Sequence, residues 1–151
     1  MVVIIPYSKN KNYHISMNIA IRYFSKFGHS AQMAEAVGQV AGVKAESVAT
    51  PINEPVDTLY IGAGIMLGKI SREMVDFINT LKPELVKRVV CFGSSAIIPS
   101  PVPQMRQLLE KQGIAVDEKS FTCKGSMGPL HAKHPNDEDL ENLRQFVKTT
   151  L

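Results

Sequence analysis

Apolar runs and helix-periodic segments alternate along most of this chain. Short apolar runs bounded by Gly, Pro or polar residues are typical of strands, and they occupy residues 18–24, 44–49, 58–62, 88–93 and 115–123. Apolar positions spaced to share one face of a helix recur at residues 29–40, 71–81, 101–112 and from Asn136 onward. This alternation predicts an α/β fold of three layers, in which an open, parallel, five-stranded sheet has helices on both faces.

Several residues define the ends and surroundings of these elements. Ser71 is placed to cap the N-terminus of one predicted helix, and Asn136, with the three acidic residues that follow it, to cap the last. A loop that contains Pro51 and Pro55 follows the second predicted strand. Residues 115–123 alternate with charged side chains, which predicts a strand near an edge of the sheet.

Open parallel sheets bind ligands at the carboxyl ends of their strands, where the strand order reverses. The segments expected there are residues 25–30, 63–69, 93–100 and 124–134. The first of them joins a strand directly to a helix, and its composition favours phosphate. Ser25 and Ser30 can donate hydroxyl hydrogens, Gly28 allows close approach of the backbone, and the first N–H groups of the helix are available to an anion.

Further residues and an alternative interpretation bear on this loop. Lys26 or His29 can add positive charge to the neutral donors. A tight turn that binds nothing is the alternative interpretation. A dinucleotide site would favour a GxGxxG motif, which the chain lacks here, so NAD is disfavoured.

Length, charge and cysteine content exclude several other classes. The 151 residues fit one domain, and no apolar run is long enough to span a membrane. The net charge of +3 is small and no run of Lys or Arg occurs, so neither nucleic acid nor an anionic membrane is an expected partner. Cys91 and Cys123 have no zinc or CxxC spacing; we interpret both as reduced, packed thiols of a cytoplasmic protein.

The first sixteen residues differ in pattern from the rest. Their apolar part is too short for a signal peptide and lacks a leading positive charge. Met17 stands directly before the first predicted strand, so our hypothesis divides the chain into an N-terminal extension, residues 1–16, and a domain, residues 17–151. The alternative is an additional edge strand at residues 2–5.

The first strand and the loop after it resemble the flavodoxin signature: an aliphatic, a hydrophobic and an aromatic residue, then a hydroxyl, a small residue and Thr at set spacing. Here the stretch reads Ile21-Arg22-Tyr23-Phe24-Ser25-Lys26-Phe27-Gly28-His29-Ser30. Arg22 replaces the hydrophobic residue, and Ser30 replaces Thr but keeps the hydroxyl. Residues 62–70, 123–125 and 134–140 are similar to later segments of short flavodoxin-like proteins. The resemblance implies the strand order 2-1-3-4-5.

The resemblance also implies that the cofactor is FMN. Its phosphate would be bound by the first loop, Ser25, Lys26, Phe27, Gly28, His29 and Ser30. Its ring would lie between two further loops, Gly64, Ile65, Met66, Leu67, Gly68 and Lys69 on one side and Ser94, Ser95, Ala96 and Ile97 on the other. Neither loop has an aromatic residue. Cys123 could approach the flavin, but a packed thiol is the favoured interpretation. His134 could donate a proton, but a capping turn is the favoured interpretation.

These expectations favour an FMN-binding electron-transfer protein that serves redox partner proteins or a small-molecule electron acceptor, as a monomer or weak homodimer. The alternative is a small FMN-dependent oxidoreductase acting on a quinone- or protoporphyrinogen-like substrate, since loops without aromatic residues leave room for a substrate. A third possibility is a binding module that has lost FMN. Carriers of this family are usually acidic, whereas this chain is mildly basic.

Overall fold

Five parallel strands form one sheet in the computed structural model, which describes residues 17–65, 68–96, 100–125 and 133–151. Their order is β2-β1-β3-β4-β5, which confirms the predicted fold and the predicted strand order. The order reverses at β1, which pairs with β2 on one side and β3 on the other. The strands are β1 (Ile19–Tyr23), β2 (Ala45–Ser47), β3 (Thr58–Ile65), β4 (Val89–Ser95) and β5 (Val116–Lys124).

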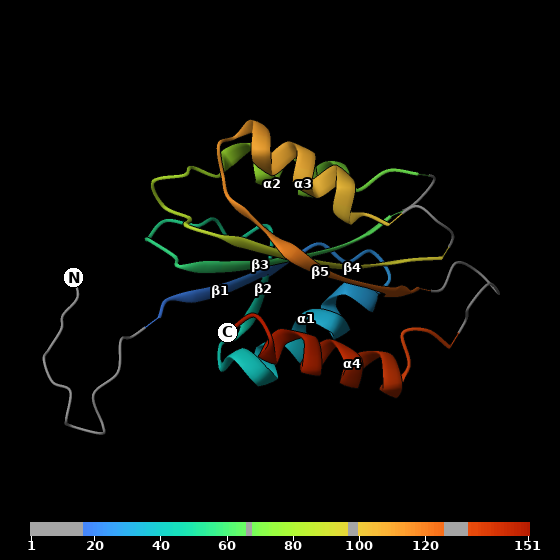
Figure 1. Cartoon of the computed structure of the whole chain (residues 1–151). Coiled ribbons are helices and arrows are strands. Elements are labelled where there is room, and N and C mark those ends of the chain that lie inside the picture. Colours follow the sequence, from blue (N-terminus) through green and yellow to red (C-terminus); the bar gives the residue numbers. More distant parts are fainter. Residues whose placement is uncertain (1–16, 66–67, 97–99, 126–132) are drawn as a thin grey trace, which may run out of the picture.

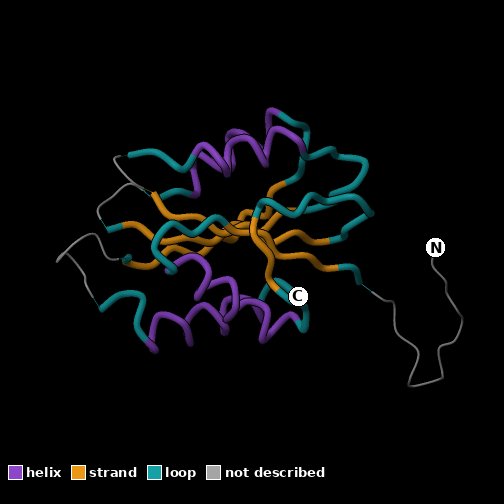
Figure 2. The backbone as a smooth tube through the Cα atoms, turned by 180° about the vertical axis from the view of Figure 1, so that it is seen from behind, coloured by secondary structure: helices purple, strands orange, loops and turns teal. Residues whose placement is uncertain are grey.

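Helices cover both faces of the sheet, so the molecule has three layers (Figures 1 and 2). One face carries the first and last helices, and the opposite face carries the two between them (Figure 1). The helices are α1 (His29–Ala41), α2 (Arg72–Thr80), α3 (Val102–Lys111) and α4 (Asp137–Lys148). Among the described residues, no helix is long and apolar enough to cross a membrane.

The core consists of two apolar clusters, one on each face of the sheet. Successive side chains of a strand point to opposite faces, so β3 contributes Leu59 and Ile61 to the cluster under α2 and α3, and Tyr60 to the cluster over α1 and α4. All three side chains have no exposed surface. This explains the continuous apolar sequence of β3, because a strand covered on both faces has no polar side.

The predicted helix caps are present. The Met74 N–H donates a hydrogen bond to Ser71 Oγ at 3.1 Å, and the predicted apolar face of α2 is buried. At α4 the caps are reciprocal: the Asp139 N–H donates to Asn136 Oδ1 at 2.8 Å, and the Asn136 N–H donates to Asp139 Oδ2 at 2.9 Å. Local sequence was sufficient to place both helix starts.

Two strands continue further than their sequence predicts. The predictions ended β3 at Gly62 and β4 at Gly93, but the strands extend to Ile65 and Ser95. The additional residues pair directly with one another, Gly64 with Ser94 and Ile65 with Ser95. Glycine and serine have low strand propensity, so pairing with the neighbouring strand outweighs the local preference here.

The connection from β2 to β3 contains no helix, and a buried arginine holds it in place. Arg22 of β1 is only 7% exposed. Its Nε–H donates to the Thr50 carbonyl at 2.8 Å, and its NH2 group donates to the Pro51 carbonyl at 3.3 Å. The remaining NH1 group donates to the Ile21 carbonyl at 3.0 Å. Arg22 therefore replaces the hydrophobic residue of the signature because it faces backbone carbonyls of a loop.

A second arginine joins α4 to the sheet at the opposite edge. The Arg88 NH1 group lies 2.6 Å from Asp117 Oδ2, and NH2 donates to the Thr150 carbonyl at 2.6 Å. The Thr150 hydroxyl donates to the Val147 carbonyl at 2.8 Å, which leaves the Tyr60 hydroxyl as the donor to Thr150 Oγ1 at 2.7 Å. The segment after α4 is thus fixed to β3 and β4.

Candidate functional site

The loop between β1 and α1 has the properties of an anion site. Gly28 is the N-cap residue of α1, with φ at 94°, a left-handed conformation that favours glycine. No side chain caps the helix, and no acidic residue lies in its first turn. The positive end of the helix dipole is therefore not neutralised by a carboxylate of its own first turn.

A buried hydroxyl in this loop has no partner. Ser25 Oγ is inaccessible to solvent and makes no hydrogen bond with any described residue. A buried polar group left unsatisfied costs about 1–3 kcal/mol, so such groups are rare and their partners are informative. A phosphate oxygen would satisfy Ser25 Oγ, and the residues of this loop therefore fit the cofactor that the sequence implies.

The structure brings a second predicted serine close to two other strand ends. Ser30 lies in the first turn of α1 and is 4% exposed. A Cβ atom placed on Gly64, near the end of β3, would lie 3.5 Å from Ser94 Oγ and 3.9 Å from Ser30 Oγ. Ser30, Gly64 and Ser94 therefore meet at the carboxyl ends of β3 and β4, as the switch-point argument predicts.

Gly125 adjoins this group. It belongs to a segment predicted at this edge, residues 124–134, but is not among the predicted cofactor-binding residues. Its N–H donates to the Ser95 carbonyl at 3.2 Å. A Cβ atom on Gly125 would lie 2.9 Å from Ser94 Oγ and 3.0 Å from Ser94 Cβ, so a side chain at this position would require Ser94 to shift. Glycine at this position therefore lets the segment after β5 pack directly on Ser94.

Other predicted residues of the first loop point to solvent. Lys26 and Phe27 are exposed, Phe27 by 64%, and Lys26 Nζ lies 5.7 Å from the centre of the Phe27 ring. His29 is partly buried at the start of α1. In this loop, then, Ser25 and Ser30 are the side chains turned inward, while Lys26 is available only at the rim.

The loop after β3 is held by a residue of α3. The Ile70 N–H donates to Gln104 Oε1 at 3.0 Å, and Gln104 Nε2 donates to the Gly68 carbonyl at 2.6 Å. Gly68 has φ at 79° and, like Lys69, is exposed. No sequence signal identified Gln104, because its contacts depend on how α3 lies beside this loop.

The loop after β4 is partly described. Ser95 ends β4 and Ala96 follows it, both partly buried. Further along, Ser100 Oγ accepts a hydrogen bond from the Val102 N–H at 3.1 Å and lies 2.8 Å from Thr122 Oγ1, which ties this loop to β5. Met66, Leu67 and Ile97, also assigned to the ring loops, lie outside the described residues, as do His131 and the extension at residues 1–16.

Cys123 and His134 have structural contacts in the folded protein. Burial, with a smaller contribution from the Asp139 charge, raises the pKa of the Cys123 thiol to about 12. Its sulfur lies 4.0 Å from Met33 Sδ in the cluster of α1 and α4. His134 Nδ1 lies 2.6 Å from Asp139 Oδ2, the same oxygen that caps α4. Both cysteines are free thiols.

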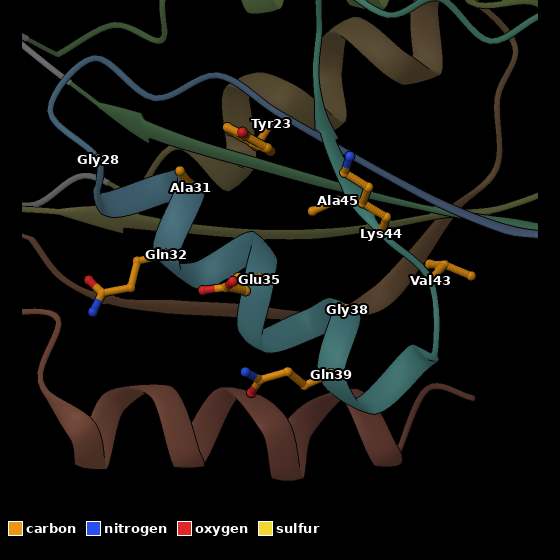
Figure 3. A pocket seen from close by; sticks show the side chains of 10 residues that line it. All are labelled: Tyr23, Gly28, Ala31, Gln32, Glu35, Gly38, Gln39, Val43, Lys44 and Ala45. Carbon is orange, nitrogen blue, oxygen red and sulfur yellow. The ribbon is translucent and has the colours of Figure 1, made fainter.

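A surface groove of about 590 Å³ lies beside α1 and borders the first loop only at Gly28 (Figure 3). Gln32, Glu35 and Gln39 project from α1, and Lys44 and Ala45 lie on the segment that enters β2. Of the predicted site residues only Gly28 lines it. In the part of the chain that the structure describes, no cluster of three or more metal-binding side chains occurs. The carboxyl edge of the sheet therefore remains the candidate site.

Comparison with known proteins gives the family of this chain. The family model of the flavodoxin domain matches residues 20–128. An uncharacterized protein of Methanocaldococcus jannaschii is 25% identical over 117 residues, which cover 70% of this chain and 77% of that protein.

Two solved flavodoxins are similar in structure. The structure of a flavodoxin from the domain Archaea has a TM-score of 0.72 and 16% identity, covering 87% of this chain and 94% of that one. Oxidised flavodoxin 2 from Bacillus cereus has a TM-score of 0.66 and 17% identity, covering 87% and 95%. At this identity the two structures support the fold alone, whereas the match to the family model covers most of the chain. This protein therefore belongs to the flavodoxin family.

Proposed function

We propose that this protein binds FMN at the carboxyl edge of its sheet and transfers electrons to a redox partner protein or a small-molecule acceptor. The observation that carries the proposal is the buried hydroxyl of Ser25, which has no hydrogen-bond partner among the described residues. It lies in a strand-to-helix loop where a phosphate would find donors. Membership of the flavodoxin family supports FMN over other phosphate compounds.

The residues of the chain would divide the binding between two tasks. Ser25, Ser30 and the first N–H groups of α1 bind the phosphate, with Lys26 and His29 adding charge at the rim. Gly64, Ile65, Gly68 and Lys69 after β3, and Ser94, Ser95 and Ala96 after β4, hold the ring and limit its contact with water. Phe27, Met66, Leu67 and Ile97 complete these loops in the proposal.

FMN, when bound, supplies the redox chemistry by taking up and releasing electrons. The chain's own contribution is to hold the ring in one orientation and to set the charge around it. Gln104 helps to orient the ring, because its hydrogen bonds with the Ile70 N–H and the Gly68 carbonyl fix the loop after β3. No catalytic side chain is needed for an electron carrier.

The test is reconstitution with FMN followed by titration of the Ser25→Ala variant. The wild-type protein is expected to bind FMN and show the visible absorbance of a flavoprotein. Loss of one hydrogen bond to a charged phosphate should raise the dissociation constant by roughly 10- to 100-fold. The FMN-free variant should be no less stable than the wild type, because the substitution removes an unsatisfied buried hydroxyl.

Ser120→Ala is the matched control, since Ser120 is exposed on β5. It should leave the dissociation constant unchanged. A wild-type protein that fails to bind FMN would refute the proposed function. FMN binding that is equal in wild type and Ser25→Ala would remove Ser25 from the site.

The absence of aromatic side chains from both ring loops favours a second candidate function. Such loops leave the face of a bound ring accessible, so a small flavoenzyme acting on a quinone-like substrate is the alternative. Steady-state turnover of the FMN-loaded protein with NADH or NADPH and a quinone separates the two. An electron carrier should turn over slowly, and an enzyme should saturate with both substrates.

A further inference from the structure

One face of the sheet lacks a helix over β1 and β2. The connections from β1 to β2, from β3 to β4 and from β4 to β5 each contain a helix, but residues 48–57 between β2 and β3 do not. On this face α2 and α3 pack together, as Figure 1 shows, and the loop after β2 lies near α2. The fold therefore leaves a position beside α2 where a further helix would fit.

A groove of about 720 Å³ occupies this position. Its wall on α2 is formed by Glu73, Asp76, Phe77 and Thr80. These residues are spaced i, i+3, i+4 and i+7, so they form one stripe along two turns of the helix, roughly 10 Å long. Phe77 is only 5% exposed, whereas Glu73, Asp76 and Thr80 are exposed along this side of α2. Side chains with this spacing can all face one neighbouring helix.

Apolar side chains form most of the remaining surface of the groove. Val48 and Pro51 belong to the loop after β2, and Phe24 follows β1. Phe24 and Val48 are partly buried and Pro51 is exposed. The Arg22 hydrogen bonds to the carbonyls of Thr50 and Pro51 attach this loop to β1. The opening is thus maintained by the fold itself.

The charge of the groove is negative. Glu73 and Asp76 are both exposed, and no Lys or Arg is among the described residues that line it. Arg72 approaches Asp76 at 3.8 Å, but both side chains are largely exposed, so this pair is weak. Two carboxylates beside an apolar strip are complementary to a ligand with an apolar face and positive charges.

We propose that this groove binds a basic amphipathic helix of a partner protein. The apolar stripe of that helix would lie against Phe24, Val48 and Pro51, and its Lys or Arg side chains would lie near Glu73 and Asp76. The groove is also lined by Ser25 and Gly28 of the loop after β1, so it adjoins the proposed phosphate site. The peptide is therefore tested on the FMN-free chain.

The test uses the full chain labelled with nitrogen-15 and a synthetic 15-residue helical peptide of leucine and lysine, with leucine along one face. Amide signals of the groove residues should shift on titration. A second peptide with glutamate in place of lysine should bind at least 10-fold more weakly. The Glu73→Lys/Asp76→Lys variant should also bind the lysine peptide at least 10-fold more weakly.

Glu84→Lys/Glu110→Lys is the matched control, because it makes the same change of charge at exposed residues outside the groove. It should bind the lysine peptide like the wild type. Absence of binding, or equal weakening in both double variants, would overturn the proposal. So would groove signals that move with protein concentration, which indicate a second copy, or nuclear Overhauser contacts from residues 2–5 to Phe77, which indicate the N-terminal extension. No readout involves FMN, so failure here leaves the proposed function untouched.

Discussion

At the scale of single residues, the two polar side chains that matter most for the site differ in how they could be found. Ser25 lies in a strand-to-helix turn that local sequence identifies, and the structure adds that its hydroxyl has no described partner. Gln104 lies in α3, more than thirty residues from the loop that it holds. A side chain that acts at such a distance has no local pattern to reveal it.

Gln104→Leu is expected to weaken FMN binding several-fold, because the Ile70 N–H and the Gly68 carbonyl both lose their partner and the loop after β3 is released. Isothermal titration of the FMN-free protein measures the change. Gln107→Leu, at an exposed position on the same helix, is the control and should bind FMN normally. Equal affinities of the two variants would show that Gln104 does not position the loop.

Tyr60→Phe tests the alkaline limit of stability. Burial raises the pKa of the Tyr60 phenol above its ordinary value, and burial raises the pKa of the Cys91 thiol to about 12. Groups with raised pKa values in the folded state keep their full stabilising effect below their unfolded pKa values and lose it as the pH rises through the folded values. Wild-type stability should therefore fall above about pH 9.

The Tyr60→Phe variant loses the hydrogen bond to Thr150 Oγ1, which should cost about 1 kcal/mol at pH 7. Its free energy of unfolding should then fall less steeply than that of the wild type between about pH 10 and 11, because one buried titrating group is gone. Urea unfolding at several pH values measures both effects. Parallel curves for the two proteins would contradict the assignment.

At the scale of elements, the sequence predicts an element boundary where the interactions that determine the boundary are local. The starts of α2 and α4 are determined by Ser71 and Asn136, which act within three residues, and both were predicted. The ends of β3 and β4 were placed too early, because Gly64 and Ser94 are held by pairing between strands that are distant in sequence. Arg22 was recognised as a departure from the signature, but its carbonyl partners become visible only in the fold.

Arg22→Met tests how the helix-free connection is stabilised. The substitution restores a hydrophobic residue but leaves the carbonyls of Thr50 and Pro51 without their charged donor. We expect a loss of about 1–3 kcal/mol in the free energy of unfolding, measured in urea. Arg72→Met, where the side chain is 87% exposed, should change stability by less than about 0.5 kcal/mol. A more stable Arg22→Met protein would show that the burial of the charge outweighs its hydrogen bonds.

At the scale of the whole molecule, the described residues that form the two apolar clusters run from Ile19 to Val147. The alternation of strands and helices was sufficient to predict this organisation, since each element had to bury one face. The helix-free groove was not predicted, because an empty position beside a helix is a property of the assembled layers. The sequence predicted which loops form the candidate site, whereas the contacts that hold these loops in place were identified only in the structure.

The hypothesis that residues 1–16 are an extension of the domain predicts that a chain beginning at Met17 folds. Its free energy of unfolding should stay within about 1 kcal/mol of that of the full chain. Removal of residues 1–16 takes away Lys9 and Lys11, so the formal charge changes from +3 to +1 and salt dependence should change slightly. Thermal and urea unfolding of both chains provide the comparison. A large loss of stability would mean that residues 1–16 form part of the fold.

The anchoring of α4 at both ends affects how the native protein opens. Asn136 and Asp139 hold its first turn, while Arg88 and Tyr60 hold the segment after its last turn. A helix fixed in this way cannot fray from its end without breaking buried bonds to the sheet. Its amide hydrogens should therefore exchange with solvent through one cooperative opening, with similar protection along its length, instead of a gradient that falls toward the terminus.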